Sequence, residues 1–235
     1  MIRAPIPYPH TTPPPPVSSG RLKKVTVAKN SLPPQWSPYF SLSARLLGSK
    51  LNSIINELTV IDVSSENAWQ IFEYLNDKLD EKDPLLQILK WEVAQVPLPI
   101  NKETSDALFF RFVSKEDSLA PEALRRMKPI LADNTLLESF CFDMEALCAL
   151  AESGDSINNV KESRSFYAFQ STHGGMGRTL SRIVQVSPWV FLFLYTCDGR
   201  KTTHEIAREI DFSDGETPWL TTIKSLWHNG LILSQ

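Results

Sequence analysis

The sequence predicts a mainly α protein, with a helical N-terminal domain followed by a C-terminal, winged-helix-like domain that contains a small β-ribbon. Apolar residues recur at helical spacing through most of residues 47–153. After residue 164, two short strands around a glycine turn lead into three helices with clear start signals. A chain of 235 residues that is 42% hydrophobic and 22% charged can bury a core of this kind.

Residues 1–22 are expected to form a disordered tail. Seven of them are prolines, a composition that favours extended polyproline II and cannot build a packed core. The same composition would suit a ligand for a proline-reading domain, or an arm that wraps a partner. Residues 23–29 fit either a short strand or an extended arm.

Residues 23–154 are expected to form the helical domain. Apolar stripes predict helices around residues 47–58 and 69–79, and Asp83 with Pro84 marks the start of a third. Residues 107–113 favour helix over strand, and Pro121 should open a helix over residues 122–131. The aromatic residues within 36–40 are candidate anchors for a partner, although core packing suits them equally well.

A capping box at Thr135 and Glu138 predicts a further helix that runs to Gly154. On that helix Cys141 and Cys148 would lie on one apolar face, as core residues. The polar run 155–163 then marks the expected boundary to the domain of residues 155–235.

The C-terminal domain should begin with strands over residues 165–170 and 179–186. Ser187-Pro188 should start a nearly all-apolar central helix, a capping box at Thr202 and Glu205 a second, and Thr217-Pro218 a third that stops at Gly230. Residues 231–233 finish as a short strand. Alternation along residues 179–186 indicates one face against helices and one exposed face.

No catalytic arrangement stands out in the sequence. The four histidines and three cysteines show no metal-ligand spacing, so the cysteines read as reduced thiols and a cytoplasmic location is expected. His173, which opens the glycine turn, is the one weak metal candidate. No apolar run is long enough to span a membrane. A net charge of −3 disfavours nucleic-acid binding, since such binding depends on neutralising phosphates.

The C-terminal third resembles the PqqD-like peptide-recognition element of enzymes that modify ribosomally made peptides. The residues that fit this pattern are Ser187, Asp198, Gly199, Thr202, Glu205, Ile206, Leu226, Gly230, Leu231 and Ile232. Family members carry three strands before the first helix, whereas two are evident here. The third is expected either in residues 155–163 or in residues 23–29.

The resemblance implies that a leader peptide binds as an added β-strand, with main-chain hydrogen bonds giving affinity and side-chain pockets giving register. The docking strand would comprise Leu180, Ser181, Arg182, Ile183, Val184, Gln185 and Val186. The groove wall would comprise Thr221, Lys224, Ser225 and His228. In this reading Val184→Pro should abolish peptide binding by removing a ladder donor.

The whole chain resembles the partner subunits of multinuclear iron oxidases in peptide natural-product biosynthesis, such as the methanobactin-biosynthesis partner protein. This similarity implies a non-catalytic subunit of a heterodimer that presents a precursor peptide, at a cysteine, to the modifying enzyme. The iron would belong to that enzyme, and no cofactor is expected in this chain. Two alternatives remain: a winged-helix DNA-binding regulator and a free-standing peptide chaperone.

Overall fold

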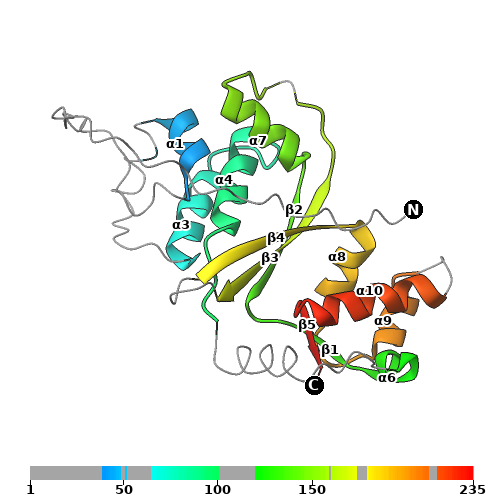
Figure 1. Cartoon of the computed structure of the whole chain (residues 1–235). Helices are drawn as coiled ribbons and strands as arrows, with labels where there is room; N and C mark the ends of the chain where they lie inside the picture. The colour runs from blue at the N-terminus through cyan, green and yellow to red at the C-terminus, as the bar shows by residue number, and fades with distance from the viewer. Residues whose placement is uncertain are drawn as a thin grey trace, which may run out of the picture.

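The computed structural model describes residues 39–48, 51, 65–100, 120–158, 160–173, 179–211 and 216–234. Within these ranges the chain forms eight helices and two antiparallel sheets, and helices pack on both sides of the larger sheet (Figure 1). The sequence predicted a mainly α chain with a small β-ribbon, and the structure confirms the coarser statement that helices combine with small antiparallel sheets. The expectations for residues 1–22, 23–29 and 107–113 lie outside the described residues.

The larger sheet contains three strands in the order β2 (Thr135–Phe140), β3 (Ser165–His173) and β4 (Thr179–Val186). Both pairings are antiparallel, and Tyr167 of the middle strand lies opposite Glu138 on one side and Gln185 on the other. Consecutive residues of β3 from Tyr167 to Ser171 are buried, so both faces of this strand are covered.

One layer of helices covers the sheet face that carries Tyr167 and Phe169. It comprises α1 (Ser41–Leu47), α4 (Pro84–Ala94) and α7 (Met144–Ser153), which share a core with these residues, and α3 (Ser65–Asn76), which packs against α4. The Trp91 ring of α4 meets Phe140, Tyr167 and Phe169 edge-on, with centroids 4.8–5.6 Å apart. Edge-to-face packing of this kind adds to the burial of the rings and fixes α4 against the sheet.

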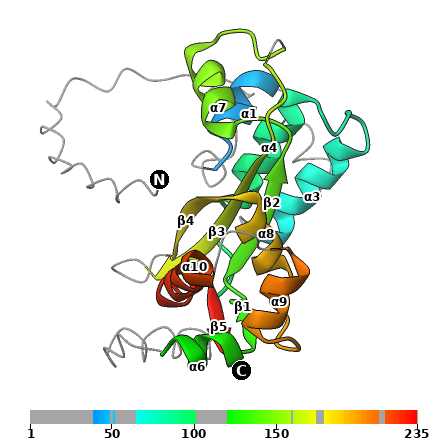
Figure 2. The ribbon, with the colours of Figure 1, turned by 90° about the vertical axis from the view of Figure 1, so that its right-hand side faces the viewer.

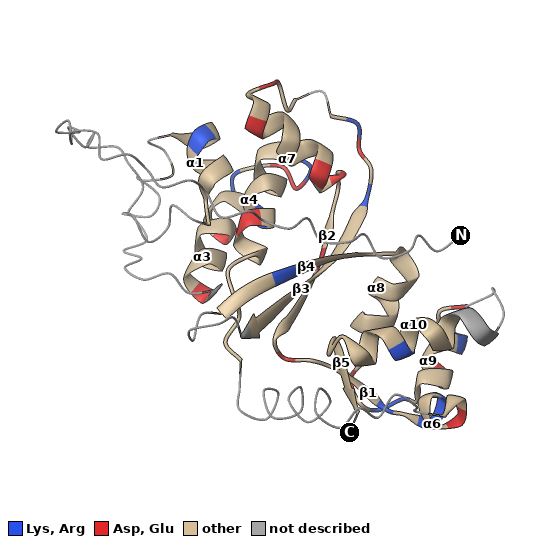
Figure 3. Cartoon of the chain, viewed as in Figure 1, with Lys and Arg blue, Asp and Glu red and all other residues tan. Residues whose placement is uncertain are grey.

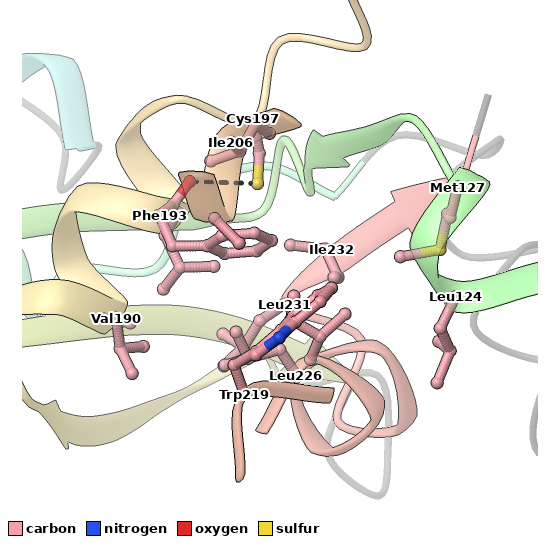
Figure 4. Packing of buried hydrophobic residues seen from close by; sticks show 14 residues of the cluster. Leu124, Met127, Val190, Phe193, Cys197, Ile206, Trp219, Leu226, Leu231 and Ile232 are labelled. Carbon is pink, nitrogen blue, oxygen red and sulfur yellow. Dashed lines mark hydrogen bonds between the residues drawn. The ribbon is translucent and has the colours of Figure 1, made fainter. Parts of the chain in front are cut away.

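The other layer covers the opposite face with α8 (Pro188–Tyr195), α9 (Thr203–Glu209) and α10 (Glu216–His228). Its core gathers Phe193, Ile206, Leu226 and Ile232 from separate elements (Figure 4). A two-stranded sheet joins β1 (Pro129–Leu131) to β5 (Ile232–Ser234), and α6 (Pro121–Arg126) packs against α9 and α10.

Several helix starts are formed by the residues that the sequence predicted. The Asp83 carboxylate accepts a hydrogen bond from the Leu85 N–H at 2.8 Å at the start of α4. The capping box of α9 is complete, because Thr202 and Glu205 each accept from the other's backbone N–H. At the start of α8, Pro188 occupies the first turn, while the Ser187 side chain makes no capping hydrogen bond.

The helix predicted to start at the Thr135 capping box is wrong in its first half. Residues 135–140 form β2, and the helix α7 begins only at Met144. The Asp143 carboxylate provides the actual cap, accepting from the N–H groups of Glu145 and Ala146. Pairing with β3 overrides the local signal because it buries Phe140 on one face of the sheet and Leu137 on the other.

Residues 122–131 are only partly helical, because α6 ends at Arg126 and residues 129–131 form β1. The third strand of the sheet is β2, and the described residues of 155–163 contain no strand. Because β2 precedes residue 155, the sheet draws on both sides of the expected domain boundary. Phe40 is fully buried in the helical core, so it is no anchor for a partner.

A buried carboxylate holds the first helix in place. The Glu92 side chain of α4 is 3% exposed, and its two oxygens accept from the N–H groups of Leu42 (2.6 Å) and Ser43 (2.9 Å) at the start of α1. These N–H groups have no partner inside their own helix, so the carboxylate satisfies them. Burial raises the pKa of Glu92 above its ordinary value, although these hydrogen bonds oppose the shift.

Arg45 at the other end of α1 makes the corresponding contact to α7. Its guanidinium donates to the carbonyls of Ala151 (3.3 Å) and Glu152 (2.6 Å) in the last turn of that helix. A cation suits a helix C-terminus because it meets unpaired carbonyls and the negative end of the helix dipole. α1 therefore joins α4 to α7.

We predict that Glu92→Gln makes stability less dependent on pH. A carboxyl whose pKa is raised in the folded state stabilises the protein fully below its unfolded pKa, and this stability is lost as the pH rises through the folded pKa. Urea unfolding between pH 4 and pH 8 should therefore show the wild type gaining stability over the variant as the pH falls. A wild-type advantage that grows with rising pH would contradict this assignment.

Candidate functional site

Strand β4 forms an edge of the larger sheet, and it is long and regular for an edge. Its eight residues pair with β3 without a bulge, from Thr179 opposite His173 to Val186 opposite Phe166. Among the described residues no strand pairs with its other side. Figure 2 shows β2, β3 and β4 side by side, with β4 outermost and α10 close to it.

Exposed apolar side chains lie on both faces of β4. Leu180 is 55% exposed and Ile183 is 37% exposed, although apolar residues of this size are usually buried. Val184 and Val186 are half-buried on the face of Ala168, which belongs to the core of α8 and α10. The sequence predicted that one face of β4 packs on helices and that the other is exposed. This holds only in part, because Leu180 lies on the same face as Val184 and Val186 but its side chain is exposed.

A chain of hydrogen bonds connects β4 to the end of α10. The Arg182 guanidinium donates through both terminal nitrogens to the Asn229 side-chain oxygen, at 3.1 Å each. The Asn229 side-chain nitrogen donates to the carbonyl of Ser225 at 2.7 Å and approaches its hydroxyl at 3.2 Å. The predicted docking residue Arg182 and the predicted wall residue Ser225 thus meet through Asn229. Asn229 was not predicted from the sequence, although its position four residues after Ser225 was an available signal.

The remaining wall residues share the exposed side of α10. Thr221, Ser225 and His228 follow one another at helical spacing and are exposed, whereas Lys224 is half-buried. The His228 ring packs against Trp227, with centroids 5.2 Å apart. Of the four predicted wall residues, Ser225 is the one joined to β4 by these bonds. The structure therefore places the four residues along one side of α10 and links Ser225 to β4 through Asn229.

A second polar contact ties the sheet to α10, and it is buried. The Gln170 side chain, 2% exposed, donates from its amide nitrogen to the carbonyl of Gly230 at 2.9 Å. Gly230 has a φ of +70°, a conformation that glycine adopts without strain, and it ends α10 as predicted. The end of α10 is therefore fixed from inside by Gln170 and from outside by Arg182.

Cys148 and Cys197 are poor candidates for chemistry. Burial raises the pKa of the Cys148 thiol to about 12 and also raises the pKa of Cys197, whose sulfur contacts the carbonyl of Phe193 at 3.2 Å. A thiol that stays protonated is neither a nucleophile nor a ready metal ligand. Cys141 lies just after β2, not on a helix with Cys148, so the expected shared helix face is wrong.

Metal binding and membrane insertion can be examined only within the described ranges. No cluster of three or more His, Cys, Asp or Glu side chains there is arranged to hold a metal ion. His173 ends β3, and its side chain lies outside what the structure describes. No described helix combines the length and apolarity needed to cross a bilayer.

No protein-family model matches the sequence, and no curated protein matches it significantly.

We predict different costs for the two contacts at the end of α10. Gln170→Ala should lower the free energy of unfolding by roughly 1–3 kcal/mol, because it leaves the buried Gly230 carbonyl unpaired. Asn229→Ala should cost less than about 1 kcal/mol, because Arg182 and Asn229 are exposed and water replaces the bond. Urea unfolding of both variants measures the difference. Equal costs would show that burial does not distinguish these contacts.

Proposed function

We propose that this chain binds an extended peptide segment by strand addition to β4. The observation that carries the proposal is the eight-residue, bulge-free edge strand with two exposed apolar side chains. Natural proteins protect such edges with lysine, proline, bulges or covering elements, because an open edge pairs with other chains. β4 contains no lysine or proline, and its one charged residue, Arg182, donates to Asn229 of α10.

The arrangement around β4 fits this mode of binding. An added strand would receive main-chain hydrogen bonds from the open side, and its side chains would meet the exposed apolar residues of β4. The three-stranded antiparallel sheet followed by α8, α9 and α10 supports the winged-helix-like, PqqD-like interpretation of this part of the chain. β2 is a third strand before α8, as in the PqqD-like pattern, although the sequence pattern pointed to residues 155–163 or 23–29.

The proposed identities of the bound peptide and of the partner enzyme follow from the resemblance in sequence. The bound segment would be the leader of a ribosomally made precursor peptide, presented at a cysteine to a metal-dependent modifying enzyme that holds iron. The layer of α1, α3, α4 and α7 lies on the far side of the sheet from α8–α10. We propose that this layer forms the surface that binds the enzyme. The cysteines of this chain are free, as expected for a cytoplasmic subunit.

A DNA-binding role receives less support from the charges. In a winged helix, α10 would enter the major groove, yet Lys224 is its sole Lys or Arg. Figure 3 shows the basic residues scattered over the chain instead of gathered along α10 and the ribbon. The net charge of −3 also opposes the electrostatic attraction to phosphates on which such binding depends.

Co-expression with the products of the neighbouring genes tests the biological form of the proposal. The tagged full chain would be purified, and the material that co-purifies would be analysed for protein and for iron. An iron-containing partner in near-equal amount supports the presenting subunit. Recovery of the chain alone, combined with strongly salt-dependent DNA binding in a titration, would favour the regulator instead.

We predict that charges on the open edge block peptide binding. Leu180→Lys with Ile183→Lys places two ammonium groups on exposed positions, where they oppose strand addition without disturbing the core. The affinity for a bound precursor peptide, measured by fluorescence anisotropy, should fall at least tenfold, while the melting temperature changes little.

Leu192→Lys on α8 is the matched control for that variant. Leu192 is 52% exposed, close to the 55% of Leu180, but it lies on a helix and not on the edge strand. Its substitution should leave peptide affinity unchanged. Equal losses in the control and the edge variant would show that general charge, and not the edge of β4, controls binding.

A further inference from the structure

The direction of the backbone groups in the sheet can be fixed from one pair of contacts. The N–H of Ser171 donates to the carbonyl of Asn134 at 2.8 Å, and the Asn134 side chain donates to the carbonyl of Ser171 at 2.7 Å. Asn134 directly precedes β2, so both backbone groups of Ser171 point away from β4. Because backbone groups alternate in direction along a strand, those of Gln170 and Thr172 point toward β4.

The register carries this alternation onto β4. Thr172 lies opposite Leu180 and Gln170 lies opposite Arg182, so the backbone groups of these β4 residues bond to β3. The Thr172 hydroxyl lies 3.4 Å from the Leu180 carbonyl oxygen, which agrees with that direction. The alternate residues therefore direct their N–H and C=O groups to the open side: Ser181, Ile183 and Gln185.

The side chains of these outward-bonding residues form a short pattern. Ile183 lies beside Phe169 of β3, which in turn lies opposite Leu136 of β2, so an apolar row crosses the sheet at this point. Ser181 and Gln185 flank Ile183 on the same face and are polar. A residue added opposite Ile183 would continue the apolar row and cover a side chain that is 37% exposed.

We infer that the ligand of β4 is an extended segment that bonds to Ser181, Ile183 and Gln185, and that carries an apolar side chain opposite Ile183 with polar side chains two residues to either side. This inference rests on the proposed strand addition and specifies its register. The pattern reads the same in both directions, so it holds for parallel and antiparallel addition.

The assignment corrects the expected effect of Val184→Pro. The N–H of Val184 bonds within the sheet, since Val184 lies opposite Ala168 and alternates with Ile183, so proline there would break the β3–β4 ladder itself. Gln185→Pro instead removes an N–H on the open side, where an edge strand tolerates proline. Gln185 is the suitable position for a proline that tests binding and not folding.

Amide hydrogen exchange of the full chain without ligand tests the backbone direction. We expect the N–H groups of Ser181, Ile183 and Gln185 to exchange at least tenfold faster than those of Arg182 and Val184, by NMR. Slow exchange at the first three and fast exchange at the other two would overturn the register, whatever the protein binds.

Selection from a displayed library of random 12-residue peptides on the immobilised full chain tests the ligand pattern. Enriched peptides should contain an apolar residue with a polar residue two positions before it and another two positions after it. Gln185→Pro and Ile183→Ala should each weaken the most enriched peptide at least tenfold, while Leu192→Ala on α8 leaves affinity within threefold. Melting curves of each variant identify any loss of folding. The exchange experiment uses the unsubstituted chain and therefore does not depend on the folding of the variants.

The outcomes separate this inference from the proposed function. Enriched peptides that bind Gln185→Pro and Ile183→Ala as tightly as the wild type would overturn the register and leave peptide binding intact. No enrichment on the wild type above the Leu180→Lys, Ile183→Lys variant would overturn both. A dimer in sedimentation that this edge variant abolishes would identify a second copy of the chain as the occupant and overturn the ligand assigned here.

Discussion

Strand β3 is paired along both of its edges and buried on both of its faces, and the rest of the structure depends on this constraint. Tyr167 and Phe169 face one helical layer, while Ala168 and Gln170 face the other. A strand so enclosed cannot slip by one residue, because a slip would move every side chain to the opposite layer. Its register therefore fixes the register of β4, and with it the side chains that β4 exposes.

Polar groups inside the protein are used to position elements. Glu92 accepts from the start of α1, Gln170 donates to the end of α10, and the Gln87 side chain links the Glu81 carbonyl to the Cys141 N–H. Each of these side chains is buried, and each satisfies backbone groups that would otherwise be unpaired. Such contacts specify which ends meet, a task that apolar packing alone performs poorly.

Local signals predicted the helices well where they acted alone. Asp83, Thr202 and Gly230 mark helix ends in the structure as they do in the sequence, because caps depend on neighbours within one turn. The signal at Thr135 failed because pairing with β3 outweighs it, and β3 lies about 30 residues later in the chain. β1 escaped prediction for the same reason, since its partner β5 lies about 100 residues away.

The candidate site also has features that the local sequence predicted and features that depend on contacts between distant segments. The pattern of residues 179–186 predicted a strand, and β4 has the bounds expected for it, whereas its proposed docking role came from the family resemblance. Asn229 and the direction of each backbone group did not follow, because both depend on contacts between distant segments, Arg182 with Asn229 and Ser171 with Asn134. The sequence gives the identities of Leu180 and Ile183, but their exposure is known only from the structure.

The path of the chain between β2 and β3 has a further consequence. After β2 the chain leaves the sheet to form α7 in the first helical layer, and it returns as β3, so neither layer can turn against the other without distorting the shared sheet (Figure 1). A segment held on β4 would consequently be mounted on a rigid support. Its free end would reach a distance set by its own length, at most about 3.3–3.6 Å for each residue. In the proposed function, the number of residues between the bound segment and the reacting residue would then determine which residue of the peptide reaches the enzyme.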